Sequence, residues 1–175
     1  MRTNGKSGFV FVNHYQRLTE LADIENAVIS AENVEFPPID VKGEVSFFMP
    51  FNMKMGDSVL EYATAQPLCK CGETYFFAEI PNIKAEYKFS KGSANIVTVP
   101  FENAKYMRKL NGTVYIGGGC NLYEENGQIH SVEDGEYICQ KWNGSEFETV
   151  KIGQSAKQSN VEITGVENAP FEPKY

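Results

Sequence analysis

The sequence predicts an all-β protein, an antiparallel sandwich or meander of consecutive hairpins with at most one or two short helices. Three observations lead to this class. Short apolar runs alternate with polar residues at period two, as strands do. Asn-Gly dipeptides separate the runs of the second half. No segment shows the strand–helix–strand alternation or the long amphipathic stretch of another class.

The strands expected in the first half are bounded by turn residues. The first, residues 9–12, is a continuous apolar run and is expected to be buried in the core. The others cover residues 44–49, 58–63, 74–80, 85–89 and 95–99. Proline cannot donate to a strand ladder, so the run 44–49 is expected to end at Pro50, and similar stops lie at Pro81 and Pro100.

The second half is expected to consist of hairpins. Asn-Gly is favoured in a two-residue type I′ turn, because both central residues need a positive φ. Three such dipeptides, each flanked by strand-like residues, therefore predict three consecutive hairpins, at Asn111-Gly112, Asn126-Gly127 and Asn143-Gly144. A last strand is expected at 161–164. Helical spacing occurs only within 15–22 and 101–107.

A soft boundary near Gly92 divides the chain into an N-terminal β unit, residues 1–92, and a hairpin-rich unit, residues 93–165, packed with it. Residues 166–175 form a proline-containing linker tail. The second unit is expected to be Ig-like, because Glu133-x-Gly135-x-Tyr137-x-Cys139 is similar to the tyrosine corner of Ig sandwiches. This pattern turns Tyr137 and Cys139 inward, with the tyrosine hydroxyl bound to a backbone group a few residues upstream.

Charge and hydropathy exclude several partners. The net charge is −7, which argues against nucleic acid, since a phosphate backbone needs a basic face, and against an anionic membrane surface. No apolar run approaches the roughly 20 residues of a membrane span. The first five residues lack the apolar region of a secretion signal, which favours a cytoplasmic over a secreted location.

The four cysteines, at 69, 71, 120 and 139, are expected to be free thiols. A Cys-x-Cys pair with two distant cysteines is a poor zinc pattern, so no metal and no cofactor are expected. The alternative that remains open is a disulfide between Cys120 and Cys139.

No catalytic constellation is present in the sequence. Hydrolysis of a glycoside needs two carboxyl groups framed across a sugar, and the paired acids Glu124-Glu125 and Glu133-Asp134 lie beside turns. No serine lies in a Gly-x-Ser-x-Gly elbow. The isolated chain is therefore not expected to be an enzyme.

The stretch GKSGFVFVNHYQRL, residues 5–18, resembles the segment after the catalytic barrel in bacterial β-galactosidases of glycoside hydrolase family 35. The resemblance continues through VEFPPIDV, FFMPFNMKMGDSVLEYATAQPLCK and ETYFFAEIPNIKAEYKF, between residues 34 and 89. It implies a non-catalytic β-rich accessory domain whose partner is the catalytic barrel of a parent enzyme. The family's catalytic glutamates belong to that barrel of about 250 residues, so no catalytic residue is carried over.

The polar residues that follow the first strand are the candidate contact site, either for another domain or for a carbohydrate. They are Asn13, His14, Tyr15, Gln16 and Arg17. Arginine and tyrosine are enriched at interfaces. If the chain is instead a carbohydrate-binding module for galactosides, Trp142 is a further contact candidate, because such modules present exposed aromatic rings. An Ig-like protein-interaction domain is the third hypothesis.

Overall fold

A computed structural model describes residues 1–133 and 135–153, and within them the all-β class and the consecutive hairpins are confirmed. The largest sheet has the order β1-β2-β7-β8-β11, with antiparallel neighbours. Its strands are β1 (Arg2–Thr3), β2 (Gly8–His14), β7 (Val45–Met55), β8 (Ser58–Ala63) and β11 (Tyr87–Lys91).

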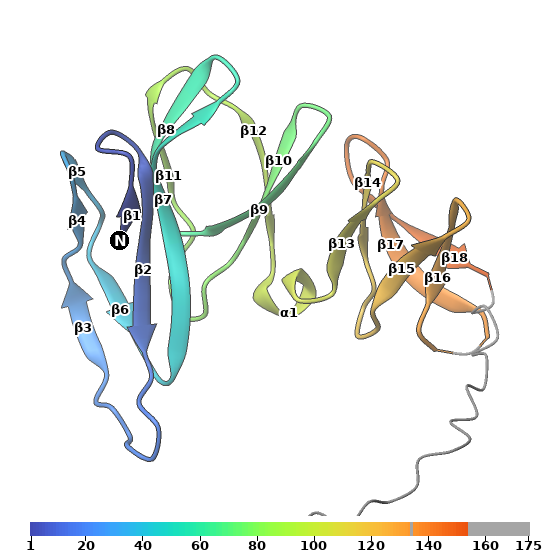
Figure 1. The fold of residues 1–175 in the computed structure, drawn as a ribbon, viewed down its shortest axis with the longest axis horizontal. Coiled ribbons are helices and arrows are strands. Elements are labelled where there is room, and N and C mark those ends of the chain that lie inside the picture. Colours follow the sequence, from blue (N-terminus) through green and yellow to red (C-terminus); the bar gives the residue numbers. More distant parts are fainter. Residues whose placement is uncertain (134, 154–175) are drawn as a thin grey trace, which may run out of the picture.

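A three-stranded sheet packs beside it, in the order β12-β10-β9. Its strands are β9 (Gln66–Cys71), β10 (Thr74–Ala78) and β12 (Asn95–Val99). β10 and β12 pair in parallel, so this pair departs from the antiparallel arrangement expected throughout. The pairing also places β12 with the first half, beyond the boundary expected near Gly92. α1 (Phe101–Ala104), the one helix among the described residues, follows β12 and precedes the hairpins of the second half (Figure 1).

The second half is a set of hairpins, shown from yellow to orange in Figure 1. A four-stranded sheet has the order β13-β14-β17-β18, and β15 and β16 form a separate pair. These strands are β13 (Met107–Leu110), β14 (Thr113–Ile116), β15 (Leu122–Glu125), β16 (Gln128–Ser131), β17 (Tyr137–Trp142) and β18 (Phe147–Ile152). The described strands are adjacent hairpins, and their order lacks the Greek-key return that defines an Ig sandwich.

Two of the three Asn-Gly turns have the predicted backbone conformation. φ is positive at both residues of Asn111-Gly112 and of Asn126-Gly127. The third differs, because only Gly144 has a positive φ, and Asn143 accepts hydrogen bonds from the backbone N–H groups of Ser145 and Glu146. That hairpin therefore closes through a longer loop that a side chain stabilises.

Several expected boundaries are corrected. β7 continues through Pro50 instead of ending there, and Pro50 precedes Phe51, the first residue that pairs with β8. A proline is tolerated in a strand where no ladder hydrogen bond needs its N–H. Residues 15–22 are not helical: Leu18 has φ 61°, and Thr19 donates to the Gln16 carbonyl in a tight turn.

Six strands have no counterpart in the sequence prediction. Besides β1 and β9, they are β3 (Ile24–Ala27), β4 (Ser30–Ala31), β5 (Val34–Glu35) and β6 (Ile39–Val41). Most are too short to produce a periodic pattern. The strand expected at 161–164 and the tail at 166–175 lie outside the described residues. No helix among the described residues is long and apolar enough to cross a bilayer.

The core consists of several clusters. One lies between β2, β7 and the short strands β4–β6, with Phe36, Met49 and Phe51 at its centre. Another joins β7 and β8 to β10 through Leu60 and Phe77. A third connects the two halves, since Phe76 and Val99 of the first half pack with side chains of the second: Met107, Val114, Ile116 and Trp142.

β17 has buried residues on both faces, which explains its mixed pattern, although Ile138 on the face of Trp142 is 60% exposed. Tyr137 and Cys139 face the cluster of the second half, as predicted, and Trp142 faces the cluster that joins the halves. The Tyr137 hydroxyl donates to the carbonyl of Gly117, twenty residues upstream and not within a local corner. Burial raises the pKa of Tyr137, and the neighbouring Cys120 and Glu133 raise it further.

All four cysteines are free thiols in this structure. Cys120 and Cys139 are buried, and Cys69 and Cys71 are half-buried. Burial raises the pKa of the Cys69 and Cys139 thiols, because the thiolate would lose its hydration. These two thiols are therefore kept in the less reactive, protonated form at neutral pH.

Candidate functional site

The main candidate site is the outer face of β1, β2 and β7. Side chains alternate along β2, and Val10 and Val12 pack on the core cluster, so Phe9, Phe11 and Asn13 point to the opposite side. Directly across the strands, Phe9 is paired with Arg2 and Pro50, and Phe11 with Phe48.

Three phenylalanines form an aromatic face there, namely Phe9, Phe11 and Phe48. The Phe48 ring contacts both others, with ring centroids 5.7 Å apart in each pair. Phe11 is 52% exposed. The run 9–12 was expected to be buried throughout, and this is corrected for Phe11. Four consecutive apolar residues carry no alternation, so the sequence could not show which of them faces water.

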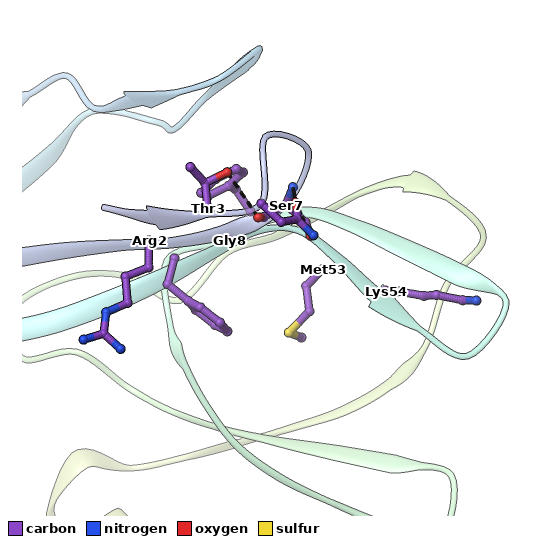
Figure 2. A pocket seen from close by; sticks show the side chains of 9 residues that line it. Arg2, Thr3, Ser7, Gly8, Met53 and Lys54 are labelled. Atoms are coloured by element: carbon purple, nitrogen blue, oxygen red, sulfur yellow. Dashed lines mark hydrogen bonds between the residues drawn. The ribbon is translucent and has the colours of Figure 1, made fainter.

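A hollow of about 370 Å³ lies at the β1 end of this face, between β1, the turn that follows it and the end of β7. In Figure 2 the side chains of Arg2 and Met53 extend to the same side of the sheet, and Lys54 extends away from it. Phe9 and Phe51 add apolar lining. Among the described residues the Arg2 guanidinium has no hydrogen-bond or ion-pair partner, so it is available to a ligand.

The backbone around this hollow is held tightly. A Cβ on Gly8 would lie 2.1 Å from the Arg2 carbonyl oxygen, so only glycine permits β1 to lie this close to β2. In the turn between them, the Asn4 side chain accepts hydrogen bonds from the N–H groups of Lys6 and Ser7. Asn52 of β7 then donates to the Lys6 carbonyl. The hollow is therefore preorganised, although its polar rim is largely occupied by these internal bonds.

The residues predicted from sequence, 13–17, lie at the other end of the same strand, where they separate into two groups. Asn13 accepts a hydrogen bond from Ser46 at 2.7 Å, on the face that carries Phe11. Tyr15, Gln16 and Arg17 are exposed at the turn that follows, beside Leu18, which is 96% exposed.

His14 has a structural role instead. It is 7% exposed, and its ring nitrogens lie 2.7 Å from the Gly43 carbonyl oxygen and 3.1 Å from that of Ala22. Asp23 also accepts a hydrogen bond from the Gly43 N–H. The imidazole thus joins the 15–23 loop to the turn before β7 and does not contact the surface that its neighbours form.

Trp142 is not available as a sugar platform. It is 6% exposed, and its ring lies at 5.1 Å from Phe76 and 5.2 Å from Phe147, measured between centroids. The only tryptophan of the chain is therefore a core residue between the two halves.

The aromatic face offers apolar and cationic groups for contact with a ligand or partner. The hollow is lined by two cations, polar turn residues and apolar side chains, and no carboxylate is among the described residues that line it. Within residues 1–133 and 135–153, no group of three or more His, Cys, Asp or Glu side chains is placed to hold a metal ion. An exposed cluster of aromatic rings beside a free arginine is typical of a recognition surface.

The fold and this face define an all-β domain with an exposed aromatic contact surface. In comparisons with known proteins, no family model, no curated protein and no solved structure matches the chain.

Proposed function

We propose that this chain is a non-catalytic accessory domain of a β-galactosidase-like glycoside hydrolase. It docks on the catalytic barrel of that enzyme through the outer face of β2 and the turn after it. The resemblance of residues 5–18 to the segment that follows the barrel in family 35 enzymes suggests the identity of the partner, and the exposed side chains of that same segment supply the contact surface.

The observation that carries the proposal is the set of exposed apolar side chains in this segment, Phe11, Tyr15 and Leu18. Phe11 and Tyr15 expose 52% and 51% of their surface, and Leu18 exposes 96%. Exposure of such side chains to water costs free energy, at roughly 25 cal/mol per Å² of apolar surface. Arg17, between Tyr15 and Leu18, is also exposed, and arginine and tyrosine dominate interface hot spots.

The test needs the reading frame around this chain and the barrel it encodes. The isolated chain is expected to leave a chromogenic β-galactoside intact and to bind the separately produced barrel. Replacing Phe11 and Leu18 together by serine should weaken that binding at least about tenfold, or ~1.4 kcal/mol. Ile138→Ser is the matched control, since Ile138 is a 60% exposed apolar residue of the second half.

Two results would contradict the docking role, and a third would contradict the non-catalytic role. One is a reading frame without a barrel beside this domain. The other is equal barrel affinity of the Phe11/Leu18 variant and the Ile138→Ser control. Turnover of the galactoside that is lost on replacing one Asp or Glu would also exclude a non-catalytic role.

The second candidate function is a carbohydrate-binding module. The half-exposed rings of Phe11 and Tyr15 favour it, because sugars stack on exposed aromatic faces. Titration with galactose and galacto-oligosaccharides separates the two functions. Saturable binding that Phe11→Ser abolishes supports the module, and its absence at millimolar sugar supports the docking domain.

A further inference from the structure

A second cavity lies in the other half of the molecule, away from the aromatic face. It is an open pocket between β16 and the sheet face formed by β14, β17 and β18. The β15–β16 hairpin packs against that sheet (Figure 1). Its volume is about 540 Å³, within the range of pockets that hold small molecules. Nothing in the proposed docking function uses it.

The floor of this cavity is apolar. Tyr115, Ile129, Val150 and Ile152 line it, and all four belong to the core cluster of the second half. Tyr115 and Ile152 are each 8% exposed. Ile129 and Val150 are partly buried. An apolar floor of this kind favours a ligand that presents an apolar body.

One cation stands beside this floor. Lys141 is half-buried at the centre of the sheet, where it lies across from Tyr115 on β14 and from Glu148 on β18. Within the described part of the chain, its ammonium has no hydrogen-bond or ion-pair partner, and Glu148 does not line the cavity. Lys151 also borders the cavity, but its ammonium is paired with the Glu136 carboxylate at 3.3 Å.

The charge of the lining is opposite to that of the whole protein. The chain has a net charge of −7, yet no Asp or Glu is among the described residues that line the cavity. At the rim, the His130 ring stacks on Tyr123 with centroids 5.4 Å apart, and Gln128 adds an amide. A partly buried ammonium that forms no ion pair is satisfied by an anionic oxygen of a ligand.

We propose that this cavity binds a small monocarboxylate with an apolar body. The carboxylate bonds to the Lys141 ammonium, and the body lies against Tyr115, Ile129 and Val150. Both parts are required: the charge selects the anion, and the floor selects a ring or alkyl group over a hydroxylated sugar acid.

The probe is benzoate. Its binding is measured by ¹H–¹⁵N NMR titration of the full chain with benzoate concentrations up to 20 mM. We expect saturable shifts of the amides of Ile129, Lys141 and Val150. Benzamide, which has the same ring without the charge, and glucuronate, which has the charge on a polar body, should each bind at least tenfold more weakly. Lys141→Met keeps the side-chain stem and should weaken benzoate at least tenfold, whereas Lys141→Arg should keep its affinity within threefold.

Lys151→Met is the matched control, because it removes a cation at the same cavity that is already paired, and it should change the affinity less than threefold. Native-like spectra of each variant show that it is folded. The proposal is overturned by the absence of saturable shifts with benzoate, by equal effects of Lys141→Met and Lys151→Met, or by benzamide or glucuronate binding as tightly as benzoate.

Discussion

The two halves of this molecule reach the same secondary structure by different routes. The first half contains local hairpins, such as β7–β8 and β9–β10, but several of its pairings join strands that are distant in sequence: β2 with β7, β8 with β11, and β10 in parallel with β12. In the second half, every strand pairs with its neighbour across a turn, and only the β14–β17 pairing spans an intervening hairpin. The first half therefore depends on burial of distant residues, and the second on turn residues and on its contact with the first.

That contact is the cluster around Trp142, and the loss of Trp142 should have the largest effect on stability. Trp142→Ala removes the ring that packs on Phe76 and Phe147. We expect a loss of about 3–5 kcal/mol in the free energy of unfolding, typical of a buried aromatic residue replaced by alanine. Urea unfolding followed by circular dichroism measures it.

Ile138→Ala is the control for this change, since Ile138 lies on the same face of β17 and is 60% exposed. It should cost well under 1 kcal/mol. A Trp142→Ala variant no less stable than this control would mean that the halves are not held together through that cluster.

The turns of the second half should have an intermediate effect. Asn111 has φ 48°, a left-handed conformation that costs most residues roughly 1–2 kcal/mol and that asparagine tolerates well. Its side chain also donates to the Gly127 carbonyl at 3.2 Å. Asn111→Ala should therefore destabilise the protein by about 1 kcal/mol in urea unfolding.

Asn126 occupies the same position in the next hairpin, with φ 51°, and Asn126→Ala tests whether the effect is general. If neither alanine variant shifts the urea midpoint, local turn chemistry does not contribute to the stability of this half.

The smallest effect is expected at Tyr137, whose hydroxyl donates to the Gly117 carbonyl. Tyr137→Phe deletes this bond and leaves the ring in place, so a loss of about 0.5–1.5 kcal/mol is expected. Tyr123→Phe is the control, because the Tyr123 hydroxyl has no hydrogen-bond partner within residues 1–133 and 135–153. Identical urea midpoints for the two variants would show that the Tyr137 bond adds nothing to stability.

The candidate sites were only partly predictable from sequence. The exposed group at 15–17 lies where the polar residues after the first strand predicted a surface. His14 and Trp142 were predicted as contacts and are buried, because each fills a gap between elements that are distant in sequence: Ala22 and Gly43 for His14, and Phe76 for Trp142. Arg2, Phe48 and Lys141 were not predicted, because only the pairing register of their strands places them in their sites.

The sequence by itself determined the all-β class, the strands at 58–63 and 95–99, and the Asn-Gly hairpins, because these depend on alternation and on φ preferences within a few residues. Tertiary structure alone decided the rest. It carried β7 through Pro50, paired β12 with β10 in parallel, and exposed Phe11 while burying Val10 and Val12 only partly. These outcomes depend on which distant surfaces become buried together, and that information is spread over residues far apart in the chain.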